Sequence, residues 1–280
     1  MEVLTIDFQA GDAKQKFARS LHETGFAVLK NHPLNWGDIE TAYREWEGFF
    51  TSDVRHQYPF KKDTQDGYVS PALSETAKGN TLKDLKSFYH LYFPQGRYPH
   101  TLSDATRRNF DRTFALGATL LSWIEHELPS EIRSKLSCPL RDMISLDRSL
   151  YRILYYPPLS GGEEPGAIRA AAHEDINLIT ILPAATDSGL QVKDKKGNWH
   201  DVQVDPHTIV VNIGDMLQEA TEYYYISTTH RVINPSGEQA KRARLSMPTF
   251  VHAKADVRIS ERYPTAAMYL DERLQELGLL

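Results

Sequence analysis

The sequence predicts helices packed on a β core within one unit of 280 residues. Three observations support this fold class. In the first half, apolar residues recur at the three- and four-residue spacing of helices. From about Tyr151 onward, short runs of β-branched and aromatic residues alternate with Gly, Pro, Asn and Asp. No linker, internal repeat or low-complexity tract divides the chain, so we expect residues 1–280 to form a single domain.

The first part of this domain, residues 1–149, is expected to be largely helical. The expected helices are residues 13–24, 36–50 and 104–128. Gly25 stands at the C-cap position of the first helix, and Gly117 lies inside the third, where glycine weakens a helix. Short strands are expected at residues 1–8 and 26–29, and residues 58–81 read as an irregular connection.

The second part, residues 150–255, is expected to be the β core. The expected strands are residues 151–156, 176–182, 190–192, 208–213, 230–233 and 245–252. Short strands at this spacing are typical of a β-sandwich or barrel. Residues 256–280 are expected to close the chain with a helix near residues 269–279.

Composition excludes several classes of protein. The charge of −5 and the pI near 6.1 argue against nucleic acid or an anionic membrane as the main partner. Cys138 is the single cysteine, which excludes a disulfide framework and a cysteine-based zinc site and fits a reducing compartment. The N-terminus has no basic-then-apolar leader and no 18-residue apolar run occurs. We therefore expect a cytoplasmic globular protein.

Common catalytic motifs are missing. The sequence contains neither of the two glycine-rich phosphate loops nor a G-x-S-x-G nucleophile elbow. His173-Glu174 begins like a zinc-peptidase motif, but Asn177 stands where the second histidine would be.

A candidate metal site lies in the segment AAHEDINLITIL. If His173 and Asp175 lie on a strand, their side chains point to the same side and can converge on one ion. His230 opens a later strand-like run and offers a third ligand. Two histidines and one carboxylate suit non-haem Fe(II), because this set leaves coordination positions open. A buried His–Asp hydrogen bond would also explain the pair.

A candidate carboxylate receptor follows in ARLSMPTF. Arg244 and Ser246 are also two residues apart, and a guanidinium with a hydroxyl on one face binds a carboxylate well. A solvated strand face is the alternative for this pair. Tyr156, in YRILYYPP, could add a hydroxyl to the same pocket, although such a segment is also typical of a core strand ended by proline.

Taken in order, these motifs resemble the isopenicillin N synthase-like branch of the Fe(II)/2-oxoglutarate-dependent dioxygenases. The matching strings are YYPP, HED, SGLQV, WHDV, VVNIGDMLQ, HRVINPSG and RLSMP, with TGFAVLKNH and KDLKSFYHLYF in the first half. The resemblance implies a distorted double-stranded β-helix, or jelly roll, with packed helices. It implies that His173, Asp175 and His230 bind iron, and that Arg244, Ser246 and Tyr156 hold the distal carboxylate of 2-oxoglutarate.

The resemblance also implies an activity. The expected enzyme uses Fe(II), 2-oxoglutarate and O2, with ascorbate as a stimulating reductant, to hydroxylate or desaturate a small molecule with release of succinate and CO2. Phe250, Tyr89 and Arg169 are the candidate substrate residues. The alternatives are a 2-oxoglutarate-independent oxidase or cyclase, an enzyme that fragments 2-oxoglutarate to ethylene and succinate, and a non-catalytic jelly-roll binding module.

The sequence departs from the family pattern at three places. Leu154 replaces the Asn that often precedes Tyr-Tyr-Pro, so a polar contact to the co-substrate is expected to be lost. Glu174 occupies the middle of H-x-D, and we expect its side chain to point away from the metal. Glu222-Tyr223 replaces a frequent Asn-Gly turn, so the tyrosine cluster at 223–225 is expected to reshape the rim of the site.

Overall fold

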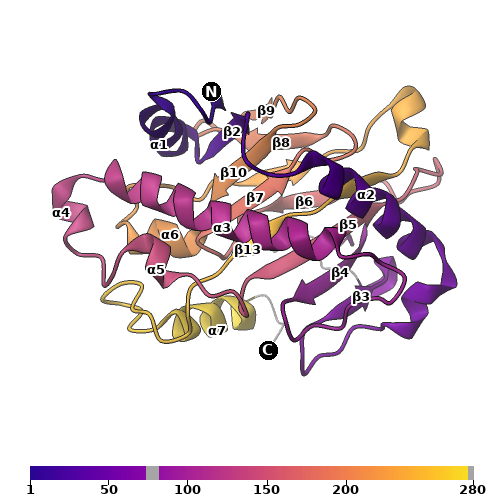
Figure 1. The fold of residues 1–280 in the computed structure, drawn as a ribbon. Coiled ribbons are helices and arrows are strands. Elements are labelled where there is room, and N and C mark those ends of the chain that lie inside the picture. The colour runs from indigo at the N-terminus through magenta and orange to yellow at the C-terminus, as the bar shows by residue number, and fades with distance from the viewer. Residues whose placement is uncertain (74–81, 277–280) are drawn as a thin grey trace.

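The computed structural model describes residues 1–73 and 82–276, and its longest helices cover one face of a large sheet (Figure 1). The three helices expected in the first half are confirmed, and Gly25 caps the first of them in a left-handed conformation. The helices are α1 (Ala13–Thr24), α2 (Trp36–Thr51), α3 (Ala105–His126), α4 (Ser130–Arg133), α5 (Leu140–Met143), α6 (Asp215–Ala220) and α7 (Ala266–Glu276), with 3-10 turns η1 (Asp53–Gln57), η2 (Pro71–Leu73) and η3 (Gly237–Lys241).

The large sheet joins strands from both halves of the chain. It is antiparallel except where its first two strands pair in parallel. In spatial order its strands are β1 (Thr5–Asp7), β2 (Phe26–Lys30), β10 (Ile209–Ile213), β7 (Ile179–Pro183), β13 (Thr249–Val251), β5 (Leu150–Tyr156), β4 (Ser87–Tyr92) and β3 (Gly67–Val69), with β12 (Arg244–Ser246) also paired to β5.

A smaller sheet faces the inner side of the large one. Its strands, in order, are β6 (Ala170–His173), β11 (His230–Val232), β8 (Leu190–Lys193) and β9 (Trp199–Asp201). Two apolar clusters join the sheets: one packs Phe26 and Val210 against Val192, and the other packs Tyr156 against Val232. Two packed antiparallel sheets with helices outside form the β core that the sequence predicts, in the jelly-roll arrangement that the resemblance implies.

The helices bury the outer face of the large sheet. Gly117 of α3 explains how closely this helix approaches: a Cβ there would lie 3.3 Å from Val251 and 3.4 Å from Ile181. The glycine that weakens the helix in the sequence therefore lets it pack directly on β13 and β7. Among the described residues, no helix is both long and apolar enough to cross a membrane.

Several predicted elements need correction. Residues 1–149 are less purely helical than expected, because β4 and β3 extend the large sheet from within this part. The single strand expected over residues 245–252 is two strands, β12 and β13, interrupted at Met247-Pro248. Proline has no N–H to donate to a ladder, which accounts for the break.

Two predicted segments extend beyond the described residues. The closing helix α7 begins at Ala266, earlier than expected, and the remainder of the prediction, residues 277–279, lies outside the described part of the chain. Within the connection expected over residues 58–81, the structure places β3 and η2, and residues 74–81 lie outside the description.

Candidate metal centre and co-substrate pocket

His173, Asp175 and His230 lie together at one end of the smaller sheet. One ligand atom from each lies within 4.8 Å of the others. Asp175 Oδ1 is 3.9 Å from His173 Nε2 and 3.7 Å from His230 Nε2. The two histidines meet because they stand directly opposite each other on the paired strands β6 and β11. The prediction that these three residues converge is therefore confirmed by their geometry.

Backbone carbonyls fix the orientation of both imidazole rings. His173 Nδ1 is 2.8 Å from the carbonyl oxygen of Ala171, and His230 Nδ1 is 3.1 Å from that of Thr228. A carbonyl oxygen only accepts, so each Nδ1 carries the proton and donates it. In a neutral ring, Nε2 then keeps a free lone pair facing Asp175, which is the form in which histidine binds a metal.

The carboxylate of Asp175 is held from the opposite side. Its Oδ2 accepts hydrogen bonds from Thr180 Oγ1 at 2.6 Å and from Asn212 Nδ2 at 2.8 Å. Thr180 and Asn212 stand opposite each other on β7 and β10, so the large sheet supplies both donors. These two residues were not predicted, because nothing in their sequence context connects them to the triad.

The electrostatics of the triad keep its ligands ready to bind a cation. Desolvation, followed by the charge of the neighbouring His230, lowers the pKa of His173 to about 4, so this ring is neutral at pH 7. Burial alone would raise the pKa of Asp175, but His230, His173 and the hydrogen bonds from Thr180 and Asn212 outweigh it and lower the pKa. A neutral imidazole and an ionised carboxylate thus face a common point with His230.

The expected strand through His173 and Asp175 is only partly correct. Strand β6 ends at His173, and Asp175 lies in the turn that follows. The start of α6 draws this turn out of the sheet: Asp215 N–H donates to the Asp175 carbonyl at 2.7 Å, and Met216 N–H donates to the Asn177 carbonyl at 3.1 Å. A Cβ at Gly214 would lie 2.1 Å from the Asn177 oxygen, so only glycine fits there.

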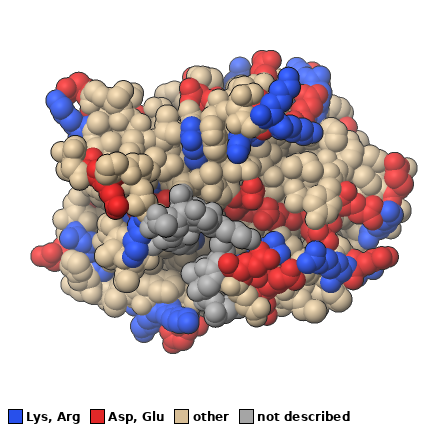
Figure 2. All heavy atoms as spheres, turned by 180° about the vertical axis from the view of Figure 1, so that it is seen from behind, with Lys and Arg blue, Asp and Glu red and all other residues tan. Residues whose placement is uncertain are grey.

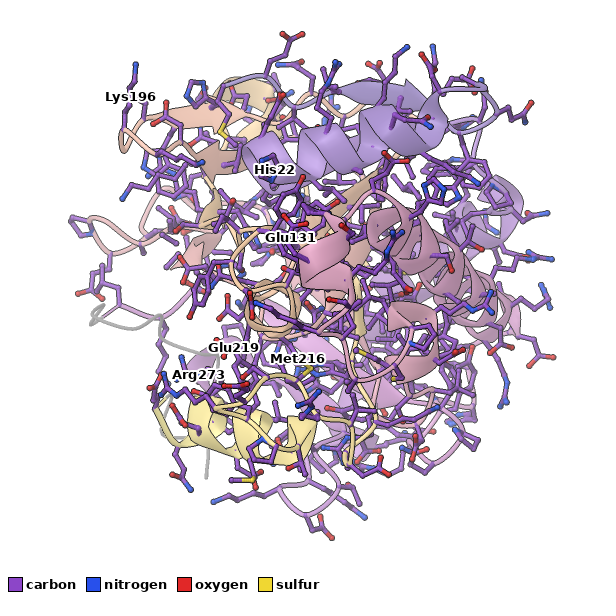
Figure 3. The ribbon with its side chains drawn as sticks, turned by 90° about the vertical axis from the view of Figure 1, so that its left-hand side faces the viewer. His22, Glu131, Lys196, Met216, Glu219 and Arg273 are labelled. Carbon is purple, nitrogen blue, oxygen red and sulfur yellow. The ribbon has the colours of Figure 1, made fainter. Side chains whose placement is uncertain are left out.

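Glu174 points away from the triad, as expected. Its carboxylate accepts a hydrogen bond from Thr229 and lines a separate polar pocket of about 380 Å³ under α7. Glu219 of α6 and Arg273 of α7 also line this pocket and lie close together in Figure 3. None of the three triad residues lines it. Burial raises the pKa of Asp215, another of its lining residues, to about 6.

Arg244, Ser246 and Tyr156 come together on the inner face of the large sheet. Arg244 pairs with Tyr156 across β12 and β5, and Ser246 pairs with Leu154. The Arg244 guanidinium lies 5.1 Å from the centre of the Tyr156 ring. Its Nε donates to the Asp187 carbonyl at 3.0 Å, whereas its buried Nη1 has no hydrogen-bond partner among the described residues.

The three candidate substrate residues separate in space. Phe250 lies on the inner face of β13, opposite Thr180, and its ring lies 5.5 Å from the Arg152 guanidinium. Tyr89 lies on the outer face of β4, packed against Trp46 with its hydroxyl bonded to the Arg97 carbonyl at 2.6 Å. That position places Tyr89 in the core under α2 and does not support the predicted substrate contact.

Arg169 lies beside Arg244 and Tyr156. It directly precedes β6 and is fully buried, and its guanidinium lies 5.9 Å from the centre of the Tyr156 ring. Arg169 thus neighbours two of the candidate co-substrate residues, Tyr156 and Arg244.

The departures from the family pattern have structural outcomes. Leu154 is part of the apolar wall between the sheets, so no polar side chain stands there.

Glu222 and Tyr223 both adopt left-handed backbone conformations, with φ of 50° and 64°. Tyr223 lines the separate polar pocket, Tyr224 stacks on His22 and Tyr225 is fully buried in the core, so these positions do not support the expected tyrosine rim of the site.

Sequence similarity places the chain in a known superfamily. The profile of the 2OG-Fe(II) oxygenase superfamily matches residues 148–253, which contain all of the candidate metal and carboxylate residues. A 2-oxoglutarate-Fe(II) type oxidoreductase from Metarhizium majus is 30% identical, over 81% of this chain and 68% of its own length. The chain belongs to the 2OG-Fe(II) oxygenase superfamily and is an enzyme of this class, which uses Fe(II), 2-oxoglutarate and O2.

Solved structures agree with this assignment. A protein from Shewanella oneidensis, assigned as an oxygenase, is 50% identical with a TM-score of 0.90, and the match covers 100% of each chain. A full-length Neurospora crassa protein, solved in complex with α-ketoglutarate, has a TM-score of 0.80 at 22% identity, covering 98% of this chain and 96% of its own. At that identity, the Neurospora protein supports the fold alone.

The residues present fit the groups that this class uses. Two imidazole nitrogens and one carboxylate oxygen on one side of a point match the donor set of a non-haem Fe(II) site. The buried, unpartnered Nη1 of Arg244 lacks an acceptor within the described part of the chain, and a carboxylate supplies one.

Proposed function

We propose that His173, Asp175 and His230 hold Fe(II) in this chain, and that Arg244, Ser246 and Tyr156 hold the distal carboxylate of 2-oxoglutarate. The observation that carries the proposal is the convergence of Asp175 Oδ1 with two imidazole Nε2 atoms, each with its other nitrogen bonded to a carbonyl. When bound, Fe(II) and 2-oxoglutarate would supply the oxidation of a small molecule by O2, with release of succinate and CO2.

The side chains of the protein have positioning tasks in this reaction. Thr180 and Asn212 orient Asp175 so that one carboxylate oxygen faces the histidines. Arg244 offers a charge-assisted hydrogen bond at a fixed position on β12. Leu154 and Val232 form an apolar wall between the sheets, which excludes water from the space around the reacting groups.

The residues on the inner face of the large sheet favour the binding of a small anionic or aromatic substrate. The Arg152 guanidinium lies 4.8 Å from the centre of the Phe88 ring and 5.5 Å from that of Phe250, and its Nε donates to His90 at 2.8 Å. Rings of this kind stack on planar groups, and a guanidinium beside them favours negative charge. Phe250 stays the candidate substrate residue on this face.

The test is a turnover assay. Purified protein with Fe(II), ascorbate and 2-oxoglutarate is screened against small acids and planar heterocycles, and succinate is quantified. We expect one class of compound to raise succinate release at least tenfold over the uncoupled rate, and His173→Ala to abolish the increase. Full activity in His173→Ala would overturn the iron assignment. Ethylene released without an added substrate would identify the fragmenting reaction, and product without succinate would identify an oxidase.

A second prediction concerns Arg244. Because Arg244→Ala removes the guanidinium and leaves the metal ligands in place, we expect 2-oxoglutarate affinity to fall by about tenfold to a hundredfold and metal affinity to change little. Both affinities are measurable by calorimetric titration. Equal losses of the two would contradict the anchoring role.

We also propose a cytoplasmic enzyme whose partner is a small molecule and not nucleic acid or a membrane. The lone Cys138 supports the compartment. The net charge of −5 and the mixture of basic and acidic side chains on the face shown in Figure 2 support the kind of partner. Cell fractionation and a binding assay with duplex DNA test it, and enrichment with membranes or salt-sensitive DNA binding would contradict it.

A further inference from the structure

The guanidinium of Arg169 is among the most deeply buried charges in the described residues. The side chain is 0% exposed, and desolvation, followed by the nearby charge of Arg244, lowers its pKa. One of its nitrogens, Nη2, donates to the Arg242 carbonyl at 3.0 Å. The other two, Nε and Nη1, are buried without a hydrogen-bond partner among the described residues. A buried cation with unmade hydrogen bonds is costly and calls for an anionic partner.

Arg169 shares its surroundings with Arg244. Both guanidinium groups lie within 6 Å of the centre of the Tyr156 ring, at 5.9 and 5.1 Å. The bond from Arg169 to the Arg242 carbonyl brings its head group to the start of the strand that carries Arg244. Arg169 itself is fixed by its backbone, since its N–H donates to Asn234 Oδ1 at 2.9 Å. Within the described chain, the two arginines therefore form one cluster with three unpartnered guanidinium nitrogens.

The charges of this cluster do not balance. Asp187 is the acidic group whose field acts on Arg169, and its backbone carbonyl accepts from Arg244. Among these three described groups, the two buried arginines and the half-buried aspartate leave one net positive charge. A single carboxylate would neutralise it and supply acceptors for the unpartnered nitrogens.

We propose that Arg169 is a second arginine of the pocket for the distal carboxylate of 2-oxoglutarate, acting together with Arg244. This inference rests on the proposed function of the site. It assigns Arg169 to the co-substrate and not to the substrate wall, where the sequence had placed it. The proposal gives this chain a two-arginine carboxylate pocket whose walls are Tyr156 and Asp187.

The test compares two ligands that differ only at the distal end. Binding of 2-oxoglutarate and of 2-oxopentanoate, in which a methyl group replaces the distal carboxylate, is measured calorimetrically on Mn(II)-loaded protein without turnover. For Arg169→Gln we expect 2-oxoglutarate affinity to fall at least tenfold, because a charge-assisted contact is lost, while 2-oxopentanoate affinity stays within about threefold. Arg242→Gln is the matched control, because it removes an exposed guanidinium nearby and should change neither affinity.

A conservative variant keeps the test possible if Arg169→Gln does not fold. Arg169→Lys keeps the charge without the planar fork, so we expect an intermediate loss of 2-oxoglutarate affinity, and this variant carries the test if Arg169→Gln does not fold. Equal losses for both ligands, or no loss for either, would overturn the role of Arg169. Failure of the wild-type protein to bind 2-oxoglutarate would instead overturn the proposed function, and the inference with it.

Discussion

At the scale of single residues, Asp175 shows how the protein prepares a ligand. Its two oxygens have different tasks: Oδ2 accepts from Thr180 and Asn212, and Oδ1 faces the two histidines. Thr180 in turn accepts from Asn177 Nδ2 at 2.9 Å, so its hydroxyl hydrogen is directed to Asp175. The carboxylate is thereby held in one rotamer before a metal arrives, which reduces the conformational cost of binding.

Asn212 provides a test of this arrangement. Asn212→Leu keeps the number and branching of the side-chain heavy atoms and removes one hydrogen bond to Asp175, so we expect metal affinity to fall by about tenfold to a hundredfold. Metal titration measures this directly. Asn109→Leu is the control, because Asn109 is equally buried but bonds Tyr151, away from the triad. A similar loss of metal affinity in both variants would show that the effect is general destabilisation.

The sequence predicted the ligand residues but not the groups that hold them. His173, Asp175 and His230 stand out by residue type and by their place in short apolar runs. Thr180 and Asn212 look like ordinary polar residues on strands, and only the register between β7 and β10 gives them a role. Tyr89 was misplaced because the register of β4 turns alternate residues to opposite faces, and its own face is the helical one.

At the scale of elements, the turn after α6 carries a strained backbone. Glu222 and Tyr223 have positive φ, which costs an ordinary residue roughly 1–2 kcal/mol. By contrast, Gly25 after α1 also has a positive φ, which glycine adopts without strain. A Cβ there would lie 2.2 Å from Thr228 Oγ1.

The strain predicts a stabilising substitution. Tyr223 is 57% exposed, so Tyr223→Gly should lose little packing and should raise the free energy of unfolding by ~0.5–1 kcal/mol. Chemical denaturation measures the change. Tyr223→Ala removes the ring but keeps the Cβ, so it should give no such gain. If the alanine variant is as stable as the glycine variant, the left-handed backbone is not the cause.

Element boundaries were predictable where local rules decide them. Helices α1, α2 and α3 follow apolar periodicity and caps, which are local signals. The strand β4 was not predicted, because both of its faces are buried and its residues show no alternation. The turn at Asp175 was not predicted either, since the start of α6, distant in sequence, draws it out of the sheet.

At the scale of the whole molecule, the two faces of the large sheet have different tasks. The outer face packs against helices (Figure 1) and supplies most of the apolar core. The inner face carries the buried polar groups of the site. The sequence predicted this layering from the change of pattern near residue 150. It could not predict the charge cluster of Arg169, Arg244 and Asp187, because that cluster depends on how the two sheets face each other.

The desolvation of His252 and Asp215 predicts that the stability of the fold depends on pH. Burial, with the charge of Arg148, lowers the pKa of His252 to about 4, whereas an unfolded histidine titrates near 6.5. The neutral ring therefore stabilises the fold above pH 6.5, and this contribution is lost as pH falls towards 4. The raised pKa of Asp215 acts in the opposite direction, since its contribution is lost as pH rises through about 6.

We expect the metal-free protein to be less stable at pH 5 than at pH 7, with His252 contributing about 2 kcal/mol at most. Urea denaturation at the two pH values measures the difference, and His252→Gln should reduce it. If the variant shows the full wild-type difference, His252 is not the group responsible.

We propose that one chain binds iron through His173, Asp175 and His230 and binds 2-oxoglutarate beside it. An anaerobic absorbance titration with Fe(II) and 2-oxoglutarate tests this most directly, because a visible charge-transfer band requires both groups on the same site. We expect a saturable band with one equivalent of each in the wild-type protein and none in Asp175→Ala. A band of full intensity in Asp175→Ala, or none in the wild-type protein, would contradict it.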